Sequence, residues 1–206
     1  MENKINYQQI LLQKLEELKE KGVKPRLCLH ACCGPCFTLP YEIIKDYFDI
    51  TVIYNNSNIY PKEEHDRRLA EFKRYIEDIG AHLEFVEFPY DNLTYNKDLE
   101  PLADDYEGHE RCRICFRKRL RQGFEYAKEH GFDIFTTTMS VSPHKDFELL
   151  NEIGKAVSEE VGIDYLWANF KKKDGYLKSI RNSQKYNLYR QNYCGCVYSL
   201  NSRVEH

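Results

Sequence analysis

The sequence predicts an α/β fold in which a parallel sheet is flanked by helices. Short apolar or β-branched runs alternate along the chain with longer segments whose apolar residues recur at helical spacing. Strands that alternate with helices form parallel sheets with right-handed crossovers. The length of 206 residues suits one domain with a sizeable core. We therefore expect a Rossmann-like domain.

Five segments of the chain have strand character. Residues 26–30 form a short apolar run, and residues 49–54 are rich in β-branched side chains. Residues 83–88 alternate between apolar and polar side chains, as a half-buried strand does. Residues 132–138 and 163–168 are expected to be the fourth and fifth strands. One sequence does not reveal the strand order, but a switch point beside the first strand would place the residues that follow it in a crevice.

The segments between these strands have helical periodicity. The expected helices span residues 37–48, 63–80, 111–130, 142–161 and about 178–189. In the second of them, Leu69, Phe72 and Ile76 share one face. Ser142 and Pro143 are expected to cap the fourth helix.

The N-terminal part of the chain differs from the alternating part. Leu11, Leu15 and Leu18 fall at helical spacing, so residues 1–23 are expected to form an amphipathic helix. Residues 24–206 are expected to form a single α/β domain with a basic, helical C-terminal segment. The N-terminus lacks the apolar core and cleavage site of a signal peptide, and no window approaches a membrane span. We expect a cytoplasmic protein without a membrane partner.

Charge is segregated along the chain, although the net charge is only −3. Residues 111–121 hold six lysines and arginines and no acid. Residues 171–190 hold seven against Asp174 alone, and acidic residues gather in 98–110. A run of like charge is usually a solvated face, and nucleic-acid binding is the competing interpretation.

Seven of the eight cysteines fall into three groups. Cys32, Cys33 and Cys36 follow the first expected strand, where a helix is expected to begin. The second group is Cys112 and Cys115, and the third is Cys194 and Cys196. Cytosolic thiols are kept reduced, so clustered cysteines indicate metal or redox chemistry rather than disulfides. The eighth, Cys28, lies inside the first strand and is expected to be a buried structural thiol.

Three chemistries compete for these cysteines. Cys33-Gly-Pro-Cys36 has the sequence of a thioredoxin-like thiol pair, but that interpretation leaves five thiols unexplained. A structural zinc site would use four ligands, yet zinc usually staples small modules without a core. An iron–sulfur cluster uses four thiolates and would leave three thiols for a second metal with an open position. We favour the iron–sulfur interpretation.

Four separated motifs carry a resemblance that covers residues 24–199. They are His30-Ala-Cys-Cys-Gly-Pro-Cys36, Arg111-Cys-Arg-Ile-Cys115, Thr136-Thr-Thr to Ser142-Pro-His-Lys145, and Arg190-Gln-Asn-Tyr-Cys-Gly-Cys196. In this order they resemble the cobalamin-independent epoxyqueuosine reductases, the QueH family. The resemblance implies an adenine-nucleotide α-hydrolase-like fold with a [4Fe–4S] cluster beside a mononuclear iron. It also implies reduction of epoxyqueuosine to queuosine in the anticodon loop of tRNA, with an external electron donor.

The resemblance and the residue chemistry together name candidate site residues. The expected cofactor and metal ligands are Cys32, Cys33, Cys36, Cys112, Cys115, Cys194 and Cys196, with Cys36 also a candidate catalytic residue at the second iron. The candidate proton sources are Tyr54, His109, Ser140 and His144. The residues expected to contact tRNA are Arg111, Arg113, Arg117, Lys145, Lys171, Lys172, Lys173 and Arg190. The alternative function is a thiol–disulfide or iron–sulfur electron-transfer protein without tRNA chemistry.

Overall fold

A computed structural model of the chain describes residues 5–204, which contain a five-stranded sheet. Its strands are β1 (Arg26–His30), β2 (Asp49–Tyr54), β3 (Glu84–Glu87), β4 (Ile134–Thr137) and β5 (Asp164–Tyr165). Every neighbouring pair is parallel, and the order across the sheet is β3-β2-β1-β4-β5. The predicted parallel α/β fold is therefore confirmed.

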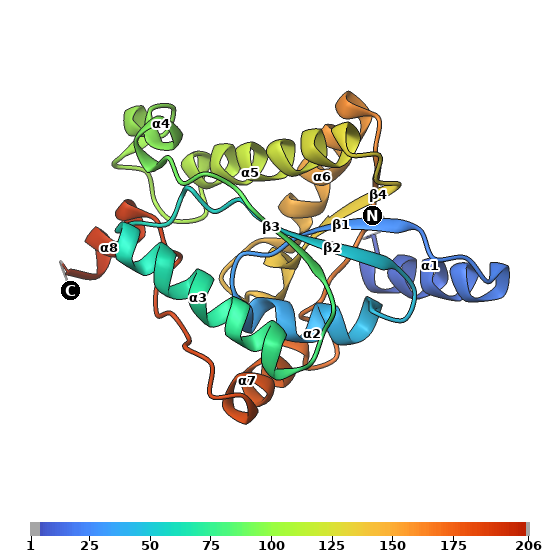
Figure 1. The fold of residues 1–206 in the computed structure, drawn as a ribbon. Coiled ribbons are helices and arrows are strands. Elements are labelled where there is room, and N and C mark those ends of the chain that lie inside the picture. The colour runs from blue at the N-terminus through green and yellow to red at the C-terminus, as the bar shows by residue number, and fades with distance from the viewer. Residues whose placement is uncertain (1–4, 205–206) are drawn as a thin grey trace.

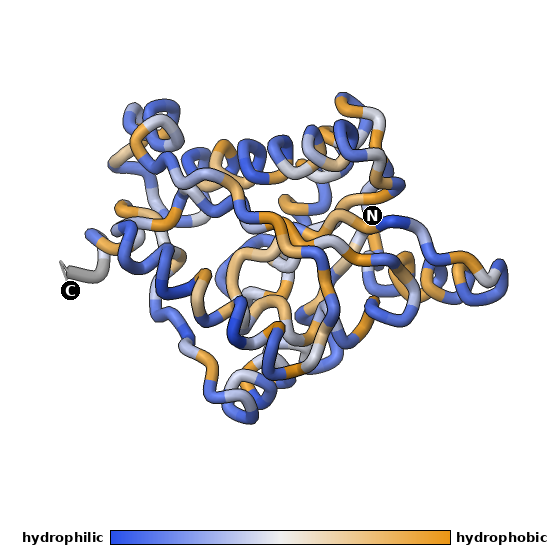
Figure 2. Tube along the Cα trace, viewed as in Figure 1, coloured by the Kyte–Doolittle hydropathy of each residue, from blue (hydrophilic) through white to orange (hydrophobic). Residues whose placement is uncertain are grey.

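Helices cover both faces of this sheet. They are α1 (Tyr7–Lys21), α2 (Gly34–Ile44), α3 (Lys62–Asp78), α4 (Asn92–Asn96), α5 (Glu110–Glu129), α6 (Phe147–Val161), α7 (Gly175–Lys185) and α8 (Val197–Val204), with the 3-10 helices η1 (Glu100–Leu102) and η2 (Thr138–Val141). Figure 1 shows α5 and α6 above the sheet and α2 and α3 below it. Each face has its own apolar cluster, and Figure 2 shows hydrophobic residues concentrated along the strands between these layers.

The alternation of side chains in β1 assigns each residue to one layer. Leu27 and Leu29 belong to the cluster under α2 and α3, whereas Cys28 belongs to the cluster under α5 and α6. Because successive residues of a strand point to opposite faces, His30 points with Cys28 toward α5. Its imidazole lies 3.2 Å from the guanidinium of Arg119 on that helix. The alternation of side chains along β1 thus places a buried histidine on the face of the sheet that α5 covers.

Helix α1 packs on the sheet rather than standing apart from it. Leu11, Leu15 and Leu18 are buried in the same cluster as Leu27 of β1. The predicted amphipathic face is confirmed, whereas the division of the chain at residue 23 stays a prediction. No helix among the described residues is both long and apolar enough to cross a membrane.

Several helix boundaries differ from the prediction; α7, for example, spans Gly175–Lys185 rather than about 178–189. Helix α2 begins at Gly34, because Pro35 fits the first turn of a helix. Helix α6 begins at Phe147, so the prediction that Ser142 and Pro143 cap it was wrong. Its N-cap is Asp146, whose carboxylate accepts hydrogen bonds from two backbone N–H groups.

The strand order creates a crevice beside β1. The chain leaves β1 toward β2 through α2 on one face, and it enters β4 through α5 on the other. The segments that follow β1 and β4 therefore diverge at the carboxyl edge of the sheet, which is where ligands bind in such folds. Cys32 and Cys33 follow β1, and η2 follows β4.

Candidate metal centre

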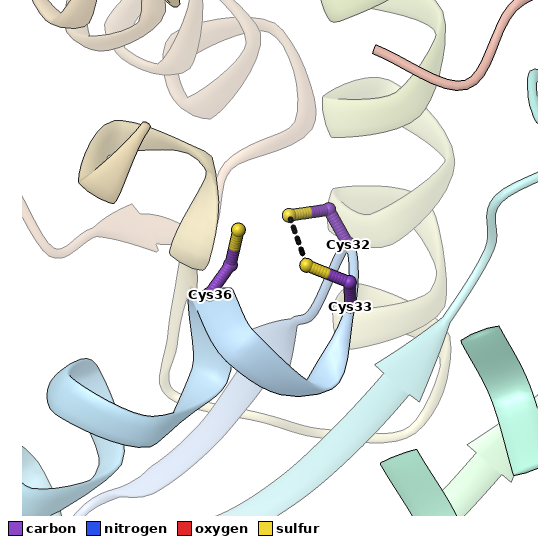
Figure 3. Close-up of side chains that lie close together, drawn as sticks. All are labelled: Cys32, Cys33 and Cys36. Atoms are coloured by element: carbon purple, nitrogen blue, oxygen red, sulfur yellow. Dashed lines mark hydrogen bonds between the residues drawn. The ribbon is translucent and has the colours of Figure 1, made fainter. Parts of the chain in front are cut away.

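Three cysteines bring their sulfur atoms together at the carboxyl end of β1. The Sγ atoms of Cys32, Cys33 and Cys36 lie within 4.8 Å of one another, which suits a shared metal ion. Figure 3 shows the three side chains pointing toward a common space. Cys33 is the N-cap of α2, and the partial positive charge of a helix N-terminus favours thiolates.

The three thiols differ in acidity because they interact with one another. Hydrogen bonds from Cys33 and Cys36 lower the pKa of Cys32 well below its usual value, and Lys145 and Arg119 act in the same direction. The contact with Cys32 raises the pKa of Cys33 to about 11 and also raises that of Cys36. Cys32 is therefore the thiol of this group that most readily forms a thiolate, which is the form that binds metals.

The second cysteine group opens α5. Cys112 and Cys115 are about one helical turn apart, so both lie on the same side of the helix. The backbone N–H of Gly108 donates to the Cys112 sulfur at 3.2 Å, and the Tyr95 hydroxyl donates to the Cys115 sulfur at 3.1 Å. Burial raises the pKa of Cys112 to about 11 and also raises that of Cys115. Both donors come from residues 88–109, the connection between β3 and α5 that also contains α4 and η1.

The third group is a tight turn formed by Cys194, Gly195 and Cys196. Gly195 has a φ of 119°, and a Cβ there would lie 2.8 Å from the Arg68 guanidinium. Arg68 donates to the carbonyl of Cys194 at 3.2 Å, and the backbone N–H of Tyr60 donates to that of Gly195 at 2.7 Å. A hydrogen bond from Cys196 lowers the pKa of Cys194 to about 5. The thiolate of Cys194 in turn helps to raise the pKa values of Cys112 and Cys115, so the second and third groups are neighbours.

A cavity of about 500 Å³ opens beside the cysteines. It is lined by Pro35, Cys36, Glu107, Val141, Ser142, Pro143, His144, Lys145, Tyr176, Ser179, Arg190, Gln191, Asn192, Tyr193 and Cys194. A void of about 10 Å³ is lined by Cys32, Asn58, Ile59, Arg68, Arg119, Lys145, Gln191 and Cys194. Lys145, Gln191 and Cys194 border both spaces, so the void beside Cys32 adjoins the cavity.

Sequence reasoning missed several residues that contact the thiols. Gln191 donates to the Cys33 sulfur at 3.2 Å, and Tyr95 donates to the Cys115 sulfur. Arg119 is only 2% exposed although it lies in the basic run of α5. A signal for it was present, because Arg119 is one helical turn beyond Cys115 and so continues the buried stripe of that helix.

The arginines expected to contact tRNA at the start of α5 have different environments. Arg111 is buried and donates to two backbone carbonyl groups of the preceding loop. Arg113 is exposed beside Glu110, and Arg117 makes an ion pair with Glu160. Arg111 therefore supports the loop, whereas Arg113 and Arg117 are accessible.

The other basic candidates lie nearer the cavity or on the surface. Lys145 and Arg190 line the cavity. Lys171 donates to the carbonyl of Lys145 at 2.9 Å, which connects the segment after β5 to a residue that lines the cavity. Lys172 and Lys173 are exposed. The contacts of all five residues with tRNA stay a prediction.

The four candidate proton sources do not meet in one place. His144 is exposed and lines the cavity. Ser140 is buried, and its hydroxyl has no hydrogen-bond partner among the described residues. Tyr54 points into the α3 layer, where its hydroxyl donates to the carbonyl of His65 at 3.4 Å. His109 is exposed at the N-cap of α5. His144 alone among these four borders the cavity.

The polar groups around the void fit a metal group that carries negative charge. Three cationic side chains and two thiols line it. The Nε–H of Arg119 is a buried donor without a hydrogen-bond partner among the described residues, so it is available to a negatively charged group. Fold and site together define a Rossmann-like protein with a thiol-rich centre, compatible with an iron–sulfur site.

Comparison with known proteins identifies the family. The chain belongs to the epoxyqueuosine reductase QueH family, whose model matches residues 27–202. A protein of that name from Staphylococcus aureus (strain Mu50 / ATCC 700699) is 38% identical over 202 residues, which cover 95% of this chain and 84% of the relative. Another from Streptococcus pyogenes serotype M1 is 36% identical, over 95% of this chain and 78% of the relative. A third, from Thermotoga maritima, is 30% identical, over 86% and 91%.

Proposed function

We propose that this chain is an oxidoreductase that reduces epoxyqueuosine to queuosine at the wobble position of tRNA, the last step of queuosine biosynthesis. The observation that carries the proposal is the family match, which includes all three cysteine groups. Cys36 of the first group and Cys194 of the third line a cavity of about 500 Å³, a size typical of small-molecule sites.

The reaction sets the requirements for the site. Conversion of an epoxide to an alkene takes two electrons and two protons, breaks two C–O bonds and releases the oxygen as water. When bound, an iron–sulfur cluster with an adjacent iron supplies single electrons and a Lewis-acidic position for the oxygen. The electrons come from an external donor. The protein must therefore hold thiolates, provide protons and admit one nucleoside.

We propose a [4Fe–4S] cluster and a mononuclear iron as the cofactors. Cys112 and Cys115 are cluster ligands, because they share one side of α5 and adjoin Cys194. The remaining cluster ligands come from Cys32 or Cys33 and from the turn at Cys194 and Cys196. Cys36 is left for the iron, since it lines the cavity in which the substrate would lie.

Two neighbouring side chains provide charge and protons to the cavity. Burial opposes the charge of Lys145, but the nearby sulfur atoms of Cys194, Cys32 and Cys36 outweigh this effect and raise the pKa of the Lys145 ammonium. Lys145 Nζ therefore stays protonated and is suited to hold an anionic oxygen. We propose His144, which also lines the cavity, as the group that delivers a proton.

The tRNA would approach over the exposed basic residues. Its wobble nucleoside must leave the stack of the anticodon loop to enter the cavity, as enzymes that act on bases require. Tyr176 and Tyr193 line the cavity and offer aromatic surfaces for a base. We propose that the protein acts in the cytoplasm, where tRNA is modified, and that residues 24–206 form the catalytic domain.

The proposal is tested by anaerobic purification, followed by iron and acid-labile sulfide analysis and by assay on tRNA that carries epoxyqueuosine. The expected result is a brown protein with sulfide that forms queuosine when supplied with a reductant. Cys28→Ala is the matched control, because Cys28 is a buried thiol of β1 outside the three groups. Stoichiometric zinc without sulfide would contradict the cofactor proposal. A cluster-bearing protein without turnover would instead favour an electron carrier.

A further inference from the structure

Arg119 is a buried cation without a carboxylate partner. Arg119 is 2% exposed, and no carboxylate among the described side chains lies within salt-bridge distance of its guanidinium. One terminal nitrogen contacts Nε2 of His30 at 3.2 Å and Oδ1 of Asn56 at 2.5 Å, both on neutral groups. Its Nε has no hydrogen-bond partner among the described residues. Arg68 differs, since it pairs with Glu64 at 2.7 Å.

The position of Arg119 explains how its charge is tolerated. It lines the void between Cys32 and Cys194. The groups that favour its charged form are Cys115, Tyr95, Cys32 and Cys194, which include a member of each cysteine group. An unpaired charge is costly to bury, so a buried arginine needs negative charge nearby. Thiolates, and a metal group bound by them, are the negative charges available here.

We propose that Arg119 is a positioning residue whose fixed charge raises the reduction potential of the metal centre held by the three cysteine groups. This inference rests on the proposed function, because it presumes a redox-active iron centre. Reduction adds one negative charge to the centre. A buried cation beside it stabilises the reduced form, and the surrounding protein screens that interaction less than water does.

The contacts of Arg119 make this charge rigid. Asn56 also donates to the carbonyl of Ala31 at 2.9 Å, which precedes the first cysteine group. His30 is held in turn by Thr137, whose hydroxyl lies 2.7 Å from Nδ1. The guanidinium is therefore held directly by His30 of β1 and by Asn56 after β2, and His30 is itself held by β4. A fixed charge needs no reorganisation when the electron arrives.

The test is a dithionite titration of the anaerobically purified holoprotein, followed by visible absorption and electron paramagnetic resonance. Arg119→Gln replaces the guanidinium with a neutral amide that can still donate hydrogen bonds. Arg119→Lys keeps the positive charge on an ammonium group. We expect Arg119→Gln to disfavour the reduced form about tenfold, a shift of about 59 mV to lower potential for one electron. We expect Arg119→Lys to keep most of the original potential. Arg121→Gln removes an exposed charge from the same helix and should leave the potential unchanged.

Each outcome decides between charge and structure. An unchanged potential in Arg119→Gln overturns the inference, and so does an equal shift in both Arg119 variants. If Arg119→Gln holds no iron, the result depends on Arg119→Lys. Retention of iron at the original potential in Arg119→Lys supports the inference. Loss of iron in Arg119→Lys as well overturns the inference. A wild-type protein without redox-active iron would contradict the proposed function itself, so the two failures are distinguishable.

Discussion

Cys28 and Cys32 belong to the same short segment, yet their surroundings give them opposite properties. Burial among apolar side chains raises the pKa of Cys28, whereas hydrogen bonds from neighbouring thiols lower that of Cys32. Reactivity and metal binding follow the thiolate. The chain thus contains a structural cysteine and a cysteine suited to metal binding only four positions apart in the sequence.

The proposed division of the thiols predicts different losses for different cysteines. Cys112→Ala or Cys115→Ala should bleach the protein, because each removes a proposed cluster ligand. Cys36→Ala should keep most of the colour and lose the extra iron, so the iron-to-sulfide ratio should fall from above one to about one. Epoxide reduction should be lost with it. Metal analysis beside turnover measures both effects.

The opposite pattern would reassign Cys36. A bleached Cys36→Ala protein would make Cys36 a cluster ligand. A fully active Cys36→Ala protein would place the extra iron elsewhere. Cys28→Ala again serves as the control, since it removes a thiol without touching the three groups.

Helix α3 holds the segment that carries the third cysteine group. Glu64 accepts from the Tyr189 hydroxyl at 3.1 Å, and Arg74 donates to the carbonyl groups of residues 186 and 187. Arg68 donates to the carbonyl of Cys194. Side chains of α3 spaced one to two turns apart therefore hold the C-terminal segment from residue 186 to the cysteine turn.

This arrangement predicts a large cost for the loss of Arg68. Arg68→Ala leaves the partly buried Glu64 carboxylate without its cationic partner, and we expect the free energy of unfolding to fall by about 3–5 kcal/mol. Lys73→Ala removes an exposed ion pair from the same helix and should cost at most about 1 kcal/mol. Urea denaturation of the anaerobically purified proteins, followed by Trp167 fluorescence, measures both. Equal losses of unfolding free energy in the two variants would contradict this role of Arg68.

Across the whole molecule, the accessible positive charge predicts a salt-dependent interaction with tRNA. Neutralising Lys172 and Lys173 should weaken binding and reduce the slope of log affinity against log salt by about one unit for each lost phosphate contact. Iron content should not change, because both side chains are exposed on the surface. Lys171→Gln is a separate case, since it also removes the contact with the loop at Lys145.

Fluorescence binding at several salt concentrations measures these slopes. An unchanged affinity and slope in the double variant would show that the two lysines form only a solvated face.

Much of the fold was predictable, because period-2 and period-3.6 patterns are local properties of the sequence. The expected strands and most helices were found, whereas the strand order needed the structure, since pairing partners are distant in sequence. The cap of α6 was misplaced because Ser142 and Asp146 are both good caps, and tertiary contacts select between them.

The cysteines of the site could be predicted by residue type, but their surroundings could not. Arg119 looked like one more exposed charge, because its partners on β1 and in the loop after β2 are distant in sequence. Tyr95 of α4 and Gly108 lie in the connection between β3 and α5, whose course no periodicity reveals. The part of the site that the sequence does not reveal is therefore the set of side-chain partners that lie far apart along the chain.

The separation of the cysteine groups along the chain has a consequence for biosynthesis. The first group emerges from the ribosome with β1, whereas Cys194 and Cys196 emerge only after all five strands have been made. Domains tend to fold as units during synthesis, so the thiol set becomes complete only when the sheet is complete. Incorporation of metal into the full set would then act as a checkpoint that separates finished molecules from nascent ones.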